Sequence, residues 1–183
     1  VFMLFLNIFL YGFFHSFLSQ PLVLYMAGRG LSVGNNIVLE SLTMIGLLMA
    51  LLHTGRFVDE RGTRVVYLTA QALVTALALL MPWLRPLEGW ALQISLAGII
   101  CLAGLSKAAV DLAMTVDIFR HSPATGRAFF IAAISIGFSL FQSAGPLATS
   151  WLLKLDAFKE GWTVAGFHFG FYETLYFLVG LCS

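Results

Sequence analysis

The sequence predicts an all-α, polytopic membrane protein built as a single six-helix domain, and three observations lead to this prediction. Of 183 residues, 60% are hydrophobic and only 10% are charged, whereas a soluble domain carries about 25% charged residues. The apolar residues gather in six runs, each long enough to cross about 30 Å of hydrocarbon as a helix or nearly so. These runs lack the ten-residue alternating segments that are typical of a membrane barrel.

The first three runs are expected over residues 2–26, 37–54 and 65–84. The first and second are separated by a cluster of glycine, serine and asparagine over residues 27–36, which is typical of a turn. The second and third are separated by the polar stretch over residues 55–64. Each run therefore ends where turn-forming or charged residues begin.

The last three runs are expected over residues 90–119, 127–153 and 162–182. The segment Arg-Pro-Leu-Glu-Gly precedes the first of them, and a Pro- and Gly-containing turn at 120–126 precedes the second. The charged stretch 154–161 precedes the third. The run 90–119 is long enough to tilt or to protrude from the bilayer.

Composition also excludes several functions. A net charge of +1 indicates no nucleic-acid partner. The two cysteines, Cys101 and Cys182, lie far apart inside apolar runs and predict neither a disulfide framework nor a metal cluster. Because the sequence shows no nucleophile–base pair, metal-ligand spacing or phosphate-binding loop, we expect no enzyme activity and no cofactor. The chain opens at Val1 and closes at Ser183 within apolar runs, so we expect it to be part of a longer protein.

The connection between the second and third runs carries a recognisable pattern. It reads Gly55-Arg-Phe-Val-Asp59-Glu-Arg61-Gly62-Thr-Arg64. We expect Gly55 to allow close approach, Gly62 to end a helix, and Asp59 to accept from amides at a neighbouring helix N-terminus. Arg61 and Arg64 are suited to contact headgroups at the cytoplasmic surface. An ordinary basic turn between two spans is the alternative interpretation.

This decapeptide resembles the signature loop of the major facilitator superfamily, roughly G-x-L-A-D-R-x-G-R-K. Glu60 replaces the usual base, and Thr63 replaces the usual arginine. Further positions follow the order found in the family's fourth and fifth spans. They are Gly104, Asp117, Pro123 and Gly126-Arg127, followed by Gly137 and Gly145-Pro146.

The resemblance implies one half of a two-half transporter, the N-terminal half in preference to the C-terminal one. It implies secondary-active transport of a small organic solute by alternating access, coupled to protons, with efflux suggested by Gly145-Pro146. The implied partners are the solute, the lipid bilayer and a second six-helix half. The implied location is multi-pass in a bacterial inner (plasma) membrane. The alternative is a non-transporting scaffold or assembly factor that binds a lipid, pigment or protein partner.

Loop cations suggest an orientation. The turns after the second and fourth runs hold five basic residues, and the other turns hold four. Because cytoplasmic loops carry an excess of lysine and arginine, this favours a cytoplasmic location for the turns after the second and fourth runs. The five are Arg56, Arg61, Arg64, Arg120 and Arg127.

Ionisable and polar residues within the runs are candidates for substrate binding or proton coupling. Lys107 and Asp111 are four residues apart and share a helix face. They form a cavity charge pair or an ion pair that only offsets two charges, or Asp111 pairs instead with an arginine at the cytoplasmic end. Glu40 is a proton or cation site, or an acid at the outer mouth. His15 is a coupling group or a hydrogen-bonding contact between helices. Gln142 is suited to contact a polar substrate. Gly104, Gly137, Gly145 and Pro146 are expected at helix-packing surfaces.

Overall fold

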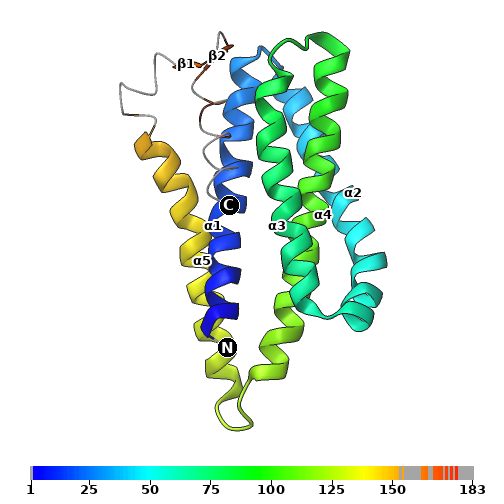
Figure 1. The fold of residues 1–183 in the computed structure, drawn as a ribbon, viewed down its shortest axis with the longest axis vertical. Helices are drawn as coiled ribbons and strands as arrows, with labels where there is room; N and C mark the ends of the chain where they lie inside the picture. The colour runs from blue at the N-terminus through cyan, green and yellow to red at the C-terminus, as the bar shows by residue number, and fades with distance from the viewer. Residues whose placement is uncertain are drawn as a thin grey trace.

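The computed structural model of the chain is a bundle of long helices and describes residues 2–152, 154, 162–164, 167–170, 172, 174 and 176. The helices are α1 (Phe2–Gly28), α2 (Val33–Arg61), α3 (Thr63–Leu80), η1 (Met81–Leu84), α4 (Gly89–His121) and α5 (Arg127–Leu152). Figure 1 shows that successive long helices run in opposite directions. The α2–α3 and α4–α5 connections lie at one end, called here the Gly62 end. The α1–α2 and α3–α4 connections lie at the other, called the Arg85 end.

Four helical segments are long and apolar enough to cross a membrane: Val33–Arg61, Thr63–Leu84, Gly89–His121 and Arg127–Leu152. Helix α4 (Gly89–His121) has 33 residues, which corresponds to about 50 Å of helix and exceeds the hydrocarbon thickness. Each of the first five predicted runs coincides with a helix of the structure. The expectation of a helical membrane protein is therefore supported, whereas the described residues do not extend to six spanning helices.

The sixth predicted run, 162–182, does not begin as a helix. Trp162–Val164 forms β1 and Phe167–Phe169 forms β2, and the two pair antiparallel with Val164 opposite Phe167. These strands consist largely of aromatic and β-branched residues, which favour extended backbone. Apolarity alone does not separate a short strand from a helix, so this part of the prediction was wrong. Residues 172, 174 and 176 are helical, and the remainder of 171–182 lies outside the described residues.

The polar stretch 55–64 is also mostly helical. Helix α2 continues through Arg61 and reverses at Gly62, whose φ of 81° is in the region that favours glycine. The amide of Gly62 donates to the Val58 carbonyl and closes the last turn. A single residue therefore makes the connection that the sequence predicted as a ten-residue loop.

The start of α2 is capped by Ser32, whose hydroxyl accepts from the Asn35 amide at 3.2 Å. Replacing Ser32 by alanine is expected to lower the free energy of unfolding by about 1 kcal/mol, because one amide at the helix start loses its acceptor. Ser41→Ala is the matched control, since that hydroxyl only donates to the Val38 carbonyl of its own helix. Thermal unfolding in detergent tests this, and equal midpoints for the two variants would contradict the capping role.

The helices pair chiefly as α2 with α4, α1 with α5, and α3 with α4. Glycines form both of the first two crossings. A Cβ on Gly104 would lie 2.5 Å from the Thr43 carbonyl oxygen, and a Cβ on Gly46 would overlap the Cys101 carbonyl oxygen. A Cβ on Gly12 would lie 2.7 Å from the Phe138 ring, and one on Gly137 would lie 3.1 Å from the Phe9 ring. Small residues thus let both helix pairs approach closely.

A continuous apolar core fills the space among α1, α3 and α4. Its most deeply buried side chains include Met26, Val74, Leu77, Met81 and Leu96. In α5, Gly145 is buried, its carbonyl accepts from the Thr149 hydroxyl at 3.1 Å, and Pro146 lies within the helix. The core therefore fixes α1 and α4 side by side, where the candidate polar residues lie.

Candidate functional site

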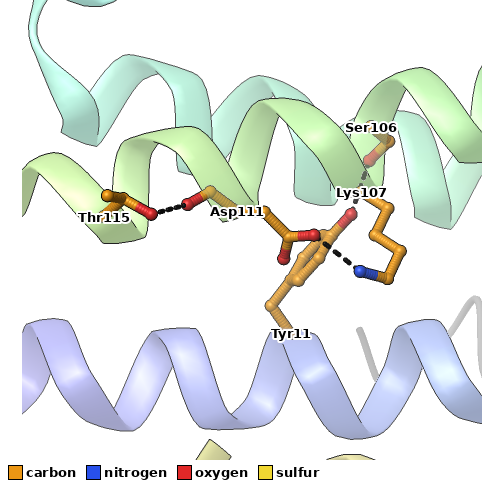
Figure 2. Close-up of polar contacts among 5 residues, drawn as sticks. All are labelled: Tyr11, Ser106, Lys107, Asp111 and Thr115. Carbon is orange, nitrogen blue, oxygen red and sulfur yellow. Dashed lines mark hydrogen bonds and ion pairs between the residues drawn. The ribbon is translucent and has the colours of Figure 1, made fainter. Parts of the chain in front are cut away.

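A polar contact joins α1, α3 and α4 inside the bundle. The Tyr11 hydroxyl lies 2.8 Å from the Ser106 hydroxyl, and Ser106 in turn donates to the Ala70 carbonyl at 3.2 Å. Figure 2 shows Tyr11 extending from α1 towards α4, where its hydroxyl meets Ser106. Both side chains are almost fully buried. A buried hydroxyl that lacked a partner would cost free energy, so this contact stabilises one arrangement of the three helices.

The ion pair of Lys107 and Asp111 lies beside this contact. Nζ of Lys107 is 2.6 Å from Oδ2 of Asp111, and the two side chains are 37% and 38% exposed. Figure 2 shows the Asp111 carboxylate close to the Tyr11 ring, between α1 and α4. The Thr115 hydroxyl donates to the Asp111 main-chain carbonyl at 2.8 Å. The predicted shared helix face thus brings two opposite charges together near the middle of α4, and they offset each other.

His15 and Glu40, predicted separately, line one cavity of about 190 Å³. His15 is buried, and its ring centroid lies 5.8 Å from that of Tyr11. Glu40 is exposed, so it lies at the cavity mouth. Gln142 is half-buried on α5 and makes no hydrogen bond within the part of the chain that the structure describes. Four of the five candidates therefore fall into two adjacent sets. Lys107 and Asp111 pair on α4, and His15 of α1 lines a cavity with Glu40 of α2.

In the segment 55–64, which resembles the signature loop, Gly55 and Asp59 differ from the expectation. A Cβ at Gly55 would meet nothing within 4 Å, so close approach does not require glycine there. Asp59 is exposed in the last turn of α2 and makes no hydrogen bond with other described residues. Arg61 lies over the Phe57 ring at 5.5 Å, and Arg64 is exposed. Both arginines are therefore available at the surface of the Gly62 end.

The acid that does reach the start of α3 is Asp117 of α4. It is 1% exposed, and its Oδ1 accepts from the Thr63 hydroxyl at 3.0 Å. Its Oδ2 has no hydrogen-bond partner among the described residues. Thr63 is the first residue of α3, where a negative charge interacts favourably with the helix dipole. The sequence marked Asp117 only by its order in the chain, and the structure identifies Thr63 as its partner.

Tyr11 and Ser106 were not among the predicted site residues. A signal for Tyr11 was present, because it precedes His15 by four residues and so shares its helix face. Ser106 directly precedes Lys107, but a serine within an apolar helix is common and does not by itself indicate a contact. Their partnership spans 95 residues of sequence, which no local pattern encodes.

Within the described residues, no group of three or more histidine, cysteine, aspartate or glutamate side chains is arranged to hold a metal ion. Comparison with known proteins adds no identification. No protein-family model matches the chain, and no curated protein or solved structure matches it. Functional inference therefore rests on the residues and their geometry.

Proposed function

We propose that this chain is one six-helix half, the N-terminal one, of a secondary-active transporter of the major facilitator type. It would carry a small organic solute across a bacterial inner membrane by alternating access, coupled to protons. The second half would come from the same chain or from a partner. Efflux is the proposed direction, from the Gly145-Pro146 pattern in α5.

The helix pairing is the observation that carries this proposal. Each half of such a transporter contains two inverted three-helix repeats. The symmetry that relates these repeats places the first helix on the fourth and the second on the fifth. It therefore predicts that the α1–α5 pair has a counterpart in the α4–α2 pair. These are the two most extensively packed pairs of the bundle, and both are built on reciprocal glycines. This correspondence supports an internal repeat that the sequence does not display.

The exposed faces of α2 and α5 also support the proposal. Only 22% and 17% of their apolar segments are buried, against 44% for α4. Large side chains at helical spacing remain uncovered on α2, among them Ile37, Met44, Leu48 and Leu52. In a complete transporter, the second half and the lipid would cover such faces.

The Lys107–Asp111 pair supplies the charge chemistry for coupling. Lys107 lies 18 residues after Gly89 in a helix of 33 residues, which is close to its middle. Charges at such depth are costly and are commonly part of a transport path. Protonation of Asp111 would release Lys107 and change the net charge of the site by one. A solute or proton can thereby shift the balance between two arrangements of the bundle.

The test is proton-linked flux in proteoliposomes that contain the complete chain. A pH-sensitive dye inside the vesicles reports proton movement as members of a solute panel are added. Asp111→Asn is expected to abolish the coupled movement, because the carboxylate no longer accepts a proton. Glu88→Gln is the matched control, since Glu88 is an exposed acid at the start of the same helix and should leave flux unchanged.

A second variant separates lost coupling from lost folding. The double variant Lys107→Gln/Asp111→Asn removes both charges and so avoids leaving a lone lysine at membrane depth. It should elute as a folded protein and remain inactive. Coupled flux in either variant would contradict the role of Asp111. Stable co-purification with a partner, without flux of any solute, would contradict transport and support the scaffold alternative.

A further inference from the structure

A partly open cavity near the Arg85 end is large enough for a small organic molecule. The cavity of about 190 Å³ lies among α1, α2, η1 and α4, and its apolar walls are formed by Leu22, Met81, Ile99 and Ile100. A cavity of about 150 Å³ in another protein binds benzene. The space inside this bundle therefore accommodates one aromatic ring or a short branched alkyl group, with room for a small polar group.

The inner part of this cavity carries an unused hydrogen-bond acceptor. His15 is 7% exposed, and its Nε2 has no hydrogen-bond partner among the described residues. In a neutral imidazole that donates with one nitrogen, the second nitrogen is an acceptor. A buried acceptor without a partner is costly, so a donor from a ligand would satisfy it.

The mouth of the cavity carries a negative charge. Glu40 is exposed, lines the cavity, and forms no salt bridge with the described residues. It lies seven residues after Val33, the first residue of α2, or about 10 Å from the helix start. The charges acting on His15 from α4 are those of Lys107 and Asp111, which form an ion pair and offset each other. The net charge at this cavity is therefore that of Glu40.

We propose that this cavity binds a small lipophilic amine in its protonated form. The hydrocarbon body would lie among the four apolar side chains, and the ammonium group would donate to Glu40, to Nε2 of His15 and to the hydroxyl of Thr43, which also lines the cavity. An ammonium group has several donors and no acceptor, which matches a site where a carboxylate, an imidazole nitrogen and a hydroxyl oxygen can each accept. As a statement about substrate, the inference rests on the proposed transport function. As a statement about binding, it depends only on the cavity.

Equilibrium binding of three ring compounds of similar size tests the charge requirement. The complete chain in lipid nanodiscs is titrated by calorimetry with benzylammonium, benzyl alcohol and benzoate, and empty nanodiscs report partition into the lipid. Benzylammonium is expected to bind about tenfold more tightly than benzyl alcohol, as hydrogen bonds to a charged acceptor predict. Benzoate is expected not to bind. Equal affinity for the cation and the alcohol, or tighter binding of benzoate, would overturn the inference without any variant.

Two substitutions locate the site. Glu40→Gln is expected to lower benzylammonium affinity about tenfold, to that of benzyl alcohol, whereas Glu88→Gln at the same end should leave it unchanged. Ala103→Leu adds side-chain volume at the cavity wall and is expected to abolish binding of both compounds. Unchanged binding in a folded Glu40→Gln or Ala103→Leu variant would overturn the assignment. If Glu40→Gln does not fold, the Ala103→Leu variant and the comparison of benzylammonium, benzyl alcohol and benzoate still test whether the cavity binds a cation.

The outcomes separate this inference from the proposed function. Specific benzylammonium binding without flux of any solute would contradict transport and leave the binding site standing. Proton-linked flux of other solutes, without charge-selective binding of benzylammonium, would contradict the binding site and leave transport standing.

Discussion

Replacing Gly46 by alanine is expected to prevent α2 and α4 from packing as they do. An added Cβ would overlap the Cys101 carbonyl oxygen and lie 2.7 Å from the Leu105 amide nitrogen. Both atoms belong to the backbone of α4, so neither can rotate away as a side chain would. Overpacking of a core typically costs 1–3 kcal/mol and sometimes more. Because the clash involves two backbone atoms, we expect a loss of about 3 kcal/mol or more, a large share of the ~5–15 kcal/mol that stabilises a typical domain.

Gly98→Ala is the matched control for this substitution. Gly98 is an exposed residue of α4, and a Cβ there would meet nothing within 4 Å. Alanine favours helix over glycine by up to about 1 kcal/mol, so this variant should be as stable as the parent or slightly more stable. Gly12→Ala should fall between the two, because the atoms it meets belong to the Phe138 ring, which can move.

Thermal unfolding in detergent, combined with gel filtration, measures this series. The expected order of unfolding midpoints is Gly98→Ala at the top, then Gly12→Ala, then Gly46→Ala. A Gly46→Ala protein that elutes normally and unfolds at the parent temperature would show that α2 and α4 do not cross as described.

Replacing Thr63 by valine is expected to destabilise the junction of α3 and α4. Asp117 is buried, and the Thr63 hydroxyl donates to its carboxylate at 3.0 Å. Valine matches threonine in shape but has no hydroxyl, so it leaves a buried carboxylate without that donor. Leaving a buried group unsatisfied costs about 1–3 kcal/mol, and more when the group is charged. We expect a loss of about 2–3 kcal/mol in the free energy of unfolding.

Two other threonine variants make this prediction specific. Thr69→Val is the matched control on the same helix, because the Thr69 hydroxyl donates only to carbonyls of its own helix, at Val65 and Val66. It should lower stability by much less than Thr63→Val. Thr63→Ser keeps the hydroxyl and should recover most of the loss. Denaturation curves for the three variants measure the effect, and equal losses at Thr63 and Thr69 would show that the contact with Asp117 contributes little.

The segment 55–64 illustrates how far local pattern carries a prediction. Glycine and charged residues between two apolar runs predicted a chain reversal, and the reversal occurs there, at Gly62. The pattern did not predict that the preceding seven residues remain helical, because charged and polar residues are tolerated in a helix that extends beyond the apolar layer. The prediction for 162–182 was wrong at its start, where residues 162–164 and 167–169 are strands, since an apolar run rich in aromatic residues is compatible with either strand or helix.

The sequence by itself determined that this is a protein of long apolar helices joined by short polar turns, and it determined most of their limits. The reason is local, because the length of an apolar run, a capping serine or a glycine at a helix end acts within a few residues of itself. Only the tertiary structure decided which helices pair and which polar groups meet. Thr63 and Asp117 are 54 positions apart, and Tyr11 and Ser106 are 95. Helical periodicity tells which face of a helix a residue lies on, but it does not tell which other helix packs against that face. The pairing of α2 with α4 and of α1 with α5 depends on where glycines let two helices approach.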